Sequence, residues 1–319
     1  MDIRWDAIVI GAGPAGASCA VWLKQLGLSP LLLESGAQPG GLLRTNSYLD
    51  VWTITSPGQT GQAMAQQLAR QIEISGLEMR CQTAVTHVHT HLRTHVHTHA
   101  QTHEQEFQVV CQPSMTDGLR PLPSADTVSF FARYVVVACG VSARAPAFMA
   151  GQSYPGVLVG PGEHVMQHPV EGLSVAILGG GDNAFENYLF VKSRGARSAR
   201  IFARSVRAQR QFVDQVPAQD VVIGEVEVDP QARTVDGETF DRILIFYGWE
   251  PRARFLDGLD VARDERGFIQ VDPLTTETSV PGLYAVGEVT QRMHPCVPTA
   301  MADGVVAAKA IEHRMGKGR

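Results

Sequence analysis

The segment AIVIGAGPAG, residues 7–16, decides the fold that the rest of the chain completes. Ile8–Ile10 are apolar and run into Gly11, which is the pattern of a buried parallel strand. A helical pattern follows over Pro14–Gln25 and is closed by a glycine. The next apolar run, LSPLLLES, ends at Glu34. The order strand, helix, strand predicts one βαβ unit of a dinucleotide-binding fold.

The loop inside this unit has the spacing GxGxxG, formed by Gly11, Gly13 and Gly16. The first glycine permits a tight turn, the second lets a pyrophosphate approach the backbone, and the third lets the helix pack closely. Helix amides and the helix dipole favour phosphate charge at this place. Glu34 ends the next strand, where a carboxylate can accept hydrogen bonds from a ribose diol. We predict a nucleotide site here; the alternative is a tight strand–helix turn with an incidental glutamate.

A second segment, VAILGGGDNAFEN at residues 175–187, repeats the pattern as GxGxxA. It belongs to a second complete βαβ unit that ends in IFARS. Between the two units, residues 77–139 alternate apolar and polar positions, which predicts an antiparallel meander. After the second unit come two apolar strands, RILIFYGWEP and GLYAVGEVT, and a helix from about Thr299 to Met315.

The predicted fold is therefore α/β, with two Rossmann-like dinucleotide-binding domains, the second inserted into the first, and an antiparallel β-meander. We expect the first, FAD-binding domain to comprise residues 1–150 and 247–319. Residues 151–246 are expected to form the second, NADPH-like domain.

Four segments in order resemble the FAD domain of the low-molecular-weight thioredoxin reductase family, a class of pyridine nucleotide-disulfide oxidoreductases. They are GAGPAGASCAVWLKQLG, ES…PGGLL, VDPLTTETSVPGLYAVGEVT and PTAMADGVVAA, and the likeness covers nearly the whole chain. The resemblance implies that FAD is the first cofactor and that the last helix points its N-terminus at the flavin ring, where the dipole stabilises negative charge. The implied FAD-binding residues are Gly11, Gly13, Pro14, Ala15, Gly16, Glu34, Gly40, Gly41, Leu42, Gly140, Gly287, Glu288, Cys296, Val297 and Ala300. Glu288 replaces the family's usual aspartate.

The segments GGGDNAFEN and YGWEPRARF resemble the NADPH domain of the same family. The implied second-nucleotide residues are Gly179, Gly181, Asp182, Asn183, Ala184, Arg204 and Arg207. Arg204 follows Ala203 where an NAD site has an acid, and an arginine can serve a 2′-phosphate. Because the family's basic signature is only partly present, the second site is expected to hold NADPH or a second FAD. A second FAD is the arrangement of the cyanobacterial diflavin-linked disulfide oxidoreductases, which the chain also resembles.

The chain has five cysteines and no CxxC. In the family, a redox dithiol precedes the second glycine loop; here that stretch, YPGVLVGPGEHVMQHP, carries Glu163 and two histidines but no cysteine. Since disulfide exchange needs a thiolate and a resolving partner, the CxxC mechanism is excluded. Cys296 and His294 are the candidate catalytic residues; a packing cysteine and a loop histidine without a role are the alternatives. A long-range disulfide among Cys19, Cys139 and Cys296 is a further possibility.

These features predict a flavin-dependent oxidoreductase that passes electrons between FAD, the second dinucleotide and an external partner. The expected partner is a thioredoxin-like protein, a ferredoxin or a low-molecular-weight dithiol; a ferredoxin–NADP reductase and a non-catalytic flavin-binding sensor are the alternatives. A net charge of −5 gives no sign of nucleic acid. No apolar stretch reaches the roughly 18–20 residues of a membrane span. Without signal-peptide features, and with an odd, scattered set of cysteines, we expect a cytoplasmic protein, and by family habit a homodimer.

Two further segments stand out. Histidines alternate at positions 87, 89, 91, 95, 97, 99 and 103, which places them on one face of a strand. If the strand folds back near Leu92–Arg93, two imidazole rows could bind zinc, nickel or copper. Because no carboxylate or cysteine completes a tetrahedral set, we expect instead an exposed hairpin extension. Residues 192–210 hold seven Lys or Arg and no acid, which indicates a solvated face or an attraction for phosphates or an acidic redox protein.

Overall fold

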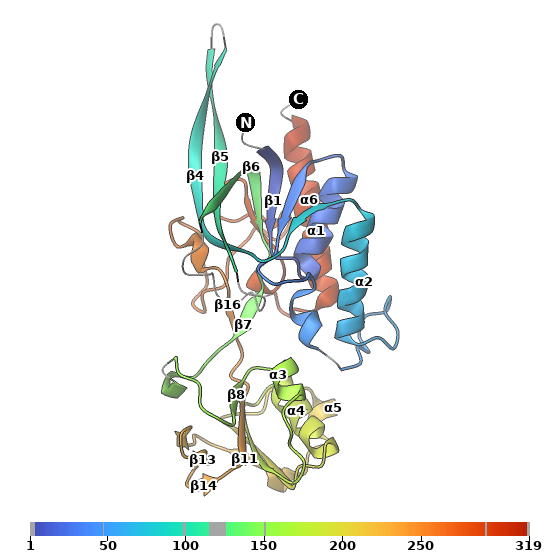
Figure 1. Ribbon diagram of the computed structural model, residues 1–319, viewed down its shortest axis with the longest axis vertical. Coiled ribbons are helices and arrows are strands. Elements are labelled where there is room, and N and C mark those ends of the chain that lie inside the picture. Colours follow the sequence, from blue (N-terminus) through green and yellow to red (C-terminus); the bar gives the residue numbers. More distant parts are fainter. Residues whose placement is uncertain are drawn as a thin grey trace. The chain divides into compact units, whose positions relative to one another are not determined.

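The computed structural model describes residues 4–46, 48–97, 100–114, 126–149, 151–290 and 292–317. It divides into two compact units, Met1–Val141 with Pro251–Arg319, and Ser142–Glu250 (Figure 1). The sequence placed the corresponding boundaries at 150/151 and 246/247. The chain passes between the two units in β7 (Val141–Ala143) and in β16 (Trp249–Pro251). These two strands pair with each other as a two-stranded sheet.

The first unit is built on one sheet in the order β3-β2-β1-β6-β5-β4, with β17 paired to the end of β6. Its strands are β1 (Arg4–Ile10), β2 (Pro30–Leu33), β3 (Glu78–Arg80), β4 (Thr83–His97), β5 (Ala100–Pro113), β6 (Val128–Val137) and β17 (Leu283–Ala285). The β4–β5 and β5–β6 pairs are antiparallel, as predicted. The meander prediction was wrong for β3, which pairs parallel with β2. Strand β6 is antiparallel to β5 and on its other edge pairs parallel with β1 and β17. Val135–Val137 are buried on both faces, which suits a central parallel strand.

Three helices cover one face of this sheet, α1 (Pro14–Gln25), α2 (Gly61–Ile74) and α6 (Val297–Lys317) (Figure 1). Helix α1 has the predicted bounds, with Pro14 at its start. Helices α1 and α6 approach closely at Gly304, where an added Cβ would stand 2.3 Å from the carbonyl oxygen of Ala15. The remaining short helices of the unit are η1 (Gly41–Thr45), η4 (Arg254–Leu256) and η5 (Gly287–Thr290).

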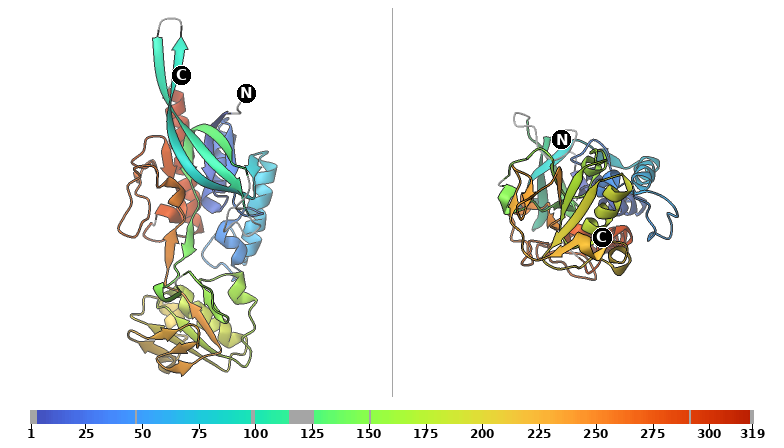
Figure 2. Two further views of the ribbon diagram at one scale, coloured as in Figure 1. Left: turned by 60° about the vertical axis from the view of Figure 1, so that its left-hand side comes forward. Right: turned by 90° about the horizontal axis from the view of Figure 1, so that it is seen from below.

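The hairpin of β4 and β5 extends well beyond the rest of the sheet (Figure 2). The predicted hairpin extension is therefore confirmed. The fold-back near Leu92–Arg93, which was the condition for two facing histidine rows, does not occur, because β4 continues through both residues to His97, which pairs with Ala100. His99 and the side chains of His95, His97 and His103 lie outside the described part of the chain.

The second unit has a five-stranded sheet in the order β11-β10-β9-β15-β8. Its strands are β8 (Val157–Val159), β9 (Ser174–Leu178), β10 (Ser198–Ala203), β11 (Val221–Ile223) and β15 (Arg242–Ile245), beside a small sheet of β12 (Val228–Asp229), β13 (Thr234–Val235) and β14 (Glu238–Thr239). Its helices are α3 (Glu163–Met166), α4 (Asp182–Ser193), α5 (Arg210–Val213), η2 (Ala147–Met149) and η3 (Ala218–Asp220). The five strands of the larger sheet are parallel, and α4 connects β9 to β10, so the predicted second βαβ unit is confirmed. The predicted α/β fold with two Rossmann-like sheets is also confirmed. Among the described helices, none has the length and apolar character to cross a bilayer.

Candidate functional site

The first glycine loop lies where the carboxyl ends of β1, β2 and β6 meet. The amide of Gly11 donates to the carbonyl of Leu33 at 2.7 Å, and the amide of Ala138 donates to the carbonyl of Ile10 at 2.8 Å. These bonds tie the end of β1 to both neighbouring strands. The loop is therefore fixed at the edge of the sheet where α/β folds bind their ligands.

The glycines of this loop are present for different reasons. Gly11 has φ +103°, and an added Cβ would meet the carbonyl oxygen of Ala138 at 2.5 Å. A Cβ on Gly16 would lie 1.9 Å from the carbonyl oxygen of Gly11, so both positions are glycine because of the protein's own packing. Gly13 has φ −73°, which any residue adopts, and an added Cβ would meet only the Cα of Gly41, at 3.8 Å. The protein's packing does not require glycine at position 13, whereas a ligand that approaches the backbone does.

Glu34 organises the loop through hydrogen bonds to its backbone. Its carboxylate accepts from the amides of Ala12 at 2.8 Å and Gly36 at 2.7 Å. The carbonyl of Ala12 in turn accepts from the amide of Gly40 at 2.8 Å. A carboxylate has about four acceptor sites, so two amide bonds leave capacity for ribose hydroxyls.

The segment that follows β2 returns to the loop, since an added Cβ on Gly41 would lie 3.1 Å from the Cα of Gly13. Leu42 is the second residue of η1 and is exposed. Pro14 and Ala15 open α1, and Gly13 supplies no side-chain cap, so the first amides of this 12-residue helix have no side-chain partner there. The structure thus gathers the predicted phosphate-binding residues in one place.

The third predicted segment, η5 with the start of α6, reaches the same region of the first unit. An added Cβ on Gly287 would lie 2.8 Å from the Cβ of Ala15 and 3.7 Å from the Cβ of Ala300. A pocket beside it is lined by Gly287, Glu288, Arg292, Pro295, Cys296, Thr299, Ala300 and Asp303. Burial raises the pKa of the Glu288 carboxyl above its usual range. Val297, the first residue of α6, packs against the cluster of Leu43, Met64 and Ala65.

Gly140 follows β6 with φ +64° and accepts from the amide of Arg252 at 3.1 Å. An added Cβ there would meet nothing within 4 Å. The left-handed backbone is therefore reason enough for glycine at this position.

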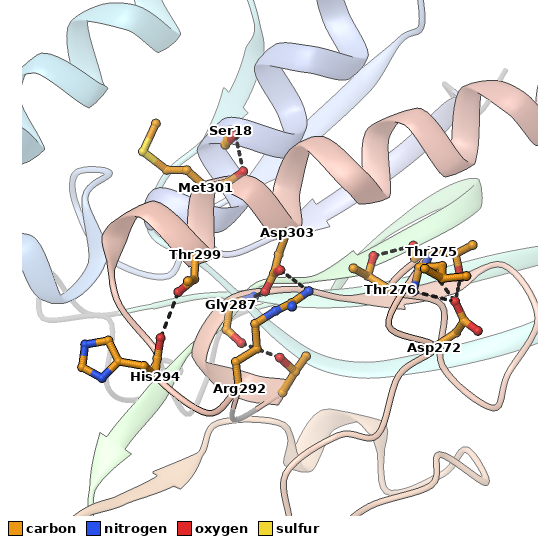
Figure 3. A network of polar contacts seen from close by, with 12 residues as sticks. Ser18, Asp272, Thr275, Thr276, Gly287, Arg292, His294, Thr299, Met301 and Asp303 are labelled. Atoms are coloured by element: carbon orange, nitrogen blue, oxygen red, sulfur yellow. Dashed lines mark hydrogen bonds and ion pairs between the residues drawn. The ribbon is translucent and has the colours of Figure 1, made fainter. Parts of the chain in front are cut away.

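The residues around this pocket form a network of polar contacts that the sequence did not predict (Figure 3). Asp303, only 3% exposed, accepts from the amide of Gly287 at 3.2 Å and forms an ion pair with Arg292. Ser18 of α1 donates to the carbonyl of Met301, two residues before Asp303, at 2.8 Å. The one available sequence signal was an acid inside the apolar segment PTAMADGVVAA, because a buried charge normally has a partner.

The two candidate catalytic residues differ in their surroundings. The thiol of Cys296 lines the pocket and lies 3.4 Å from the hydroxyl of Thr299, which also accepts from the Cys296 amide at 3.0 Å. The hydroxyl of Thr299 is also 3.3 Å from the carbonyl of His294. The imidazole of His294 is exposed and is not part of the pocket lining.

All five cysteines are free, so the disulfide considered among Cys19, Cys139 and Cys296 is not formed. Burial raises the pKa of Cys19 and raises that of Cys111 to about 12. Burial likewise raises the pKa of Cys139 to about 12, although the charge of Arg252 opposes the shift. Thiols with such high pKa values are poor nucleophiles at neutral pH.

The second glycine loop repeats the division of roles seen in the first. Gly179 has φ +143°, and a Cβ there would lie 2.5 Å from the carbonyl oxygen of Phe246. A Cβ on Gly180 would lie 2.0 Å from the carbonyl oxygen of Ser205, whereas a Cβ on Gly181 would meet nothing within 4 Å. Gly181 caps the 12-residue helix α4 without a side-chain cap. The open position again lies at the N-terminus of a helix, where a phosphate fits.

The other predicted residues of the second site lie around this loop. Asp182 accepts from the amide of Gln209 at 2.7 Å and from its side chain at 2.9 Å. The carbonyl of Asn183 accepts from the side chain of Asn187 at 2.7 Å, and Ala184 is fully buried. The structure therefore assigns these three residues local bonds and packing within the unit.

The arginines that follow β10 lie beside the same loop. The amide of Arg207 donates to the carbonyl of Gly180 at 2.6 Å, and the side chains of Arg204 and Arg207 are exposed. Other arginines of the basic run pair with surface acids, Arg197 with Asp241, Arg200 with Glu238 and Arg210 with Asp214. Within the described residues, Arg204 and Arg207 have no such ion pair and are available for a phosphate.

Glu186 on α4 is a second residue that sequence reasoning missed. Burial, aided by the charge of Asp182 one turn earlier, raises the pKa of its carboxyl to about 7. The side chain is half-buried and lies near the N-terminus of α4, where Gly181 provides no side-chain cap.

Comparisons with known proteins agree with this architecture. A model of the pyridine nucleotide-disulphide oxidoreductase family matches residues 5–304. The chain is 25% identical to a thioredoxin reductase of Mycolicibacterium smegmatis, over 95% of this chain and 94% of that protein. It is 28% identical to a ferredoxin–NADP reductase of Limosilactobacillus fermentum, over 90% of this chain and 86% of that protein. The crystal structure of Lactococcus lactis thioredoxin reductase in its FR conformation shares the fold with a TM-score of 0.75, at 22% identity over 98% of this chain and 99% of that one.

Proposed function

The chain belongs to the pyridine nucleotide-disulphide oxidoreductase family, as a thioredoxin reductase-like flavoprotein oxidoreductase, and on that premise we propose how it works. In this proposal the first unit binds FAD, the second binds NADPH, and electrons pass to an external acceptor without a dithiol in the chain. The observation that carries the proposal is the pair of open glycines, Gly13 and Gly181. Each marks a helix N-terminus that a pyrophosphate can reach, and neither is required by the protein's packing.

The residues of the first unit fit FAD. The amides at the start of α1 hold the pyrophosphate, and Glu34 accepts from the adenosine ribose. The start of α6 lies next to Cys296 in the pocket, where the helix dipole stabilises negative charge on the ring system. FAD, when bound, supplies the hydride and electron chemistry, while the chain binds, orients and shields it.

The residues of the second unit fit NADPH. Gly181 opens α4 to the pyrophosphate, and Arg204 and Arg207 are placed beside the loop for a 2′-phosphate. A second FAD is the alternative occupant. It is favoured by Ala203 and Ser205, small residues on either side of Arg204, which leave the basic signature of an NADPH site incomplete.

The chain has no CxxC motif, and this limits the routes by which electrons can pass to an acceptor. Four of the five thiols have pKa values raised by burial. We therefore propose that the acceptor is reduced directly at the flavin. One NADPH then reduces two molecules of a one-electron carrier such as a ferredoxin, releasing NADP⁺ and one proton. With a disulfide acceptor, one NADPH and one proton yield NADP⁺ and two thiols.

The likeness to a ferredoxin–NADP reductase supports the first kind of acceptor, and the likeness to thioredoxin reductases supports the second. A homodimer is part of the proposal. The decisive experiment counts flavins per chain and then adds NADPH to the yellow protein without oxygen. One flavin and rapid bleaching support the proposal. Two flavins without bleaching support the diflavin alternative, and one flavin that no donor reduces supports a sensor.

The acceptor is tested next, by steady-state turnover with a ferredoxin and with a thioredoxin disulfide. Turnover with the ferredoxin alone supports the one-electron route. Turnover with the disulfide that is lost in Cys296→Ser would give that thiol a catalytic role.

A further inference from the structure

The histidines of this chain are concentrated in one place that the nucleotide sites do not use. Of the 11 histidines, seven lie between positions 87 and 103, in the hairpin of β4 and β5. This hairpin extends away from the rest of its unit (Figure 2). The enrichment therefore calls for an explanation of its own.

The described histidines of β4 form a row on the outer face of the sheet. His87, His89 and His91 are exposed, whereas Val88 between them is 1% exposed and faces the core. Alternation along a strand keeps the three imidazoles on one side. The rings of His87 and His89 are stacked, with centroids 5.9 Å apart and an interplanar angle of 6°.

We propose that this histidine row, His87, His89 and His91, binds a divalent transition-metal ion such as Cu²⁺, Ni²⁺ or Zn²⁺. A metal with two imidazole ligands at about 2.0–2.1 Å spans at most about 4 Å between the two nitrogens. The ring centroids of His87 and His89 lie 5.9 Å apart, so chelation requires rotation about the side-chain bonds to bring one nitrogen of each ring to that separation. His89 is the common member of both neighbouring pairs, so it contributes to either chelate.

The residues around His91 favour metal binding by the histidine row. The Nε2 of His91 lies 2.8 Å from the side-chain oxygen of Gln108, whose amide nitrogen donates to Ser129 at 2.9 Å. An outer partner of this kind fixes the ring of a metal ligand and leaves the other ring nitrogen, Nδ1, for the ion. Glu106, opposite His91 in the register, forms an ion pair with Arg4.

The donor set also indicates the kind of ion. Among the described residues, no three His, Cys, Asp or Glu side chains converge on one point, so the site is a two-imidazole chelate completed by water. Imidazole suits copper, nickel and zinc, whereas Mg²⁺ and Ca²⁺ require oxygen ligands. Binding should therefore be strongest for Cu²⁺ and absent for Mg²⁺.

The test uses the full chain and calorimetric titration with CuCl₂, NiCl₂ and MgCl₂, with Cu²⁺ electron paramagnetic resonance to detect nitrogen ligands. A distal variant removes the other histidines of the hairpin: His95→Ser, His97→Ser, His99→Ser and His103→Ser. The proposal expects this variant to retain at least one Cu²⁺ ion with nitrogen hyperfine structure. Adding His89→Ala to it should weaken binding by at least tenfold. Adding His313→Ala instead, an exposed histidine on α6, should change nothing.

Circular dichroism and thermal unfolding of each variant show whether the fold is intact. If the distal variant binds no ion, the row is not a site. If His89→Ala leaves its affinity unchanged, the proposed ligands are wrong.

Discussion

The substitution Gly13→Ala tests whether glycine is required at position 13 for binding FAD or for folding. The new Cβ would meet only the Cα of Gly41 at 3.8 Å, and the backbone φ of −73° suits alanine. We therefore expect the free energy of unfolding of the flavin-free protein to change by less than about 1 kcal/mol, as for a cap substitution. The methyl group would stand where the pyrophosphate approaches. Losing one hydrogen bond to a charged group costs about 1.5–3 kcal/mol, so the Kd for FAD should rise about 10- to 150-fold.

The matched control is Gly16→Ala in the same loop. Its Cβ would lie 1.9 Å from the carbonyl oxygen of Gly11, so the backbone must shift. Overpacking of this kind costs about 1–3 kcal/mol, and we expect a lower Tm without FAD. The assay is thermal unfolding of both flavin-free variants, together with FAD titration followed by flavin fluorescence. The reasoning fails if Gly13→Ala binds FAD as tightly as the native chain, or if its flavin-free Tm falls as far as that of Gly16→Ala.

Three further predictions concern other parts of the molecule. Replacing Arg204 and Arg207 with Gln should raise the KM for NADPH about tenfold or more and leave that for NADH unchanged, because only NADPH carries the 2′-phosphate; an equal rise for both nucleotides would contradict this. Asp303→Asn should lower the free energy of unfolding by about 1–3 kcal/mol, and combining it with Arg292→Gln should cost less than the sum of the two changes, which a double-mutant cycle in urea would measure. The pKa of Glu186 is raised to about 7 in the folded chain, so the free energy of unfolding falls as pH rises from the ordinary pKa of about 4.5 to about 7 and is level above that. Glu186→Gln should accordingly be more stable than the native chain at pH 8, with the difference shrinking toward pH 5; a difference that stays constant with pH would refute the assignment.

The sequence predicted those elements whose ends are set by local chemistry. Helix α1 has the predicted bounds because Pro14 suits the first helical position and a glycine ends the helix. The start of α6 was predicted two residues late, at Thr299 instead of Val297. The hydroxyl of Thr299 accepts from the amide of Cys296, the residue before the helix. This bond therefore links the helix to the turn that precedes it, and Thr299 does not mark the first helical residue.

What the sequence did not predict depends on contacts between distant segments. Strand β3 pairs parallel with β2 because the chain returns to that edge after α2, and alternation alone does not reveal direction. No fold-back occurs at Leu92–Arg93, because neither residue favours a turn and β4 continues to His97. Likewise, a pattern cannot show that Arg292 closes on Asp303, 11 residues further along the chain.

The glycines of the two loops show how far a motif can be interpreted. The sequence pattern assigns these glycines roles in a tight turn, in the approach of a pyrophosphate and in close helix packing, but it cannot show which of them the chain's own packing requires. The structure separates them: an added Cβ on Gly11, Gly16, Gly179 or Gly180 would collide with a backbone oxygen of its own unit, whereas one on Gly13 would make only an ordinary contact at 3.8 Å and one on Gly181 would meet nothing within 4 Å. A chain that had lost both nucleotides would still need the first four and would tolerate side chains at the last two. Positions 13 and 181 are nevertheless glycine in both units. This is the strongest reason to expect that the chain binds two dinucleotides rather than retaining the fold without them.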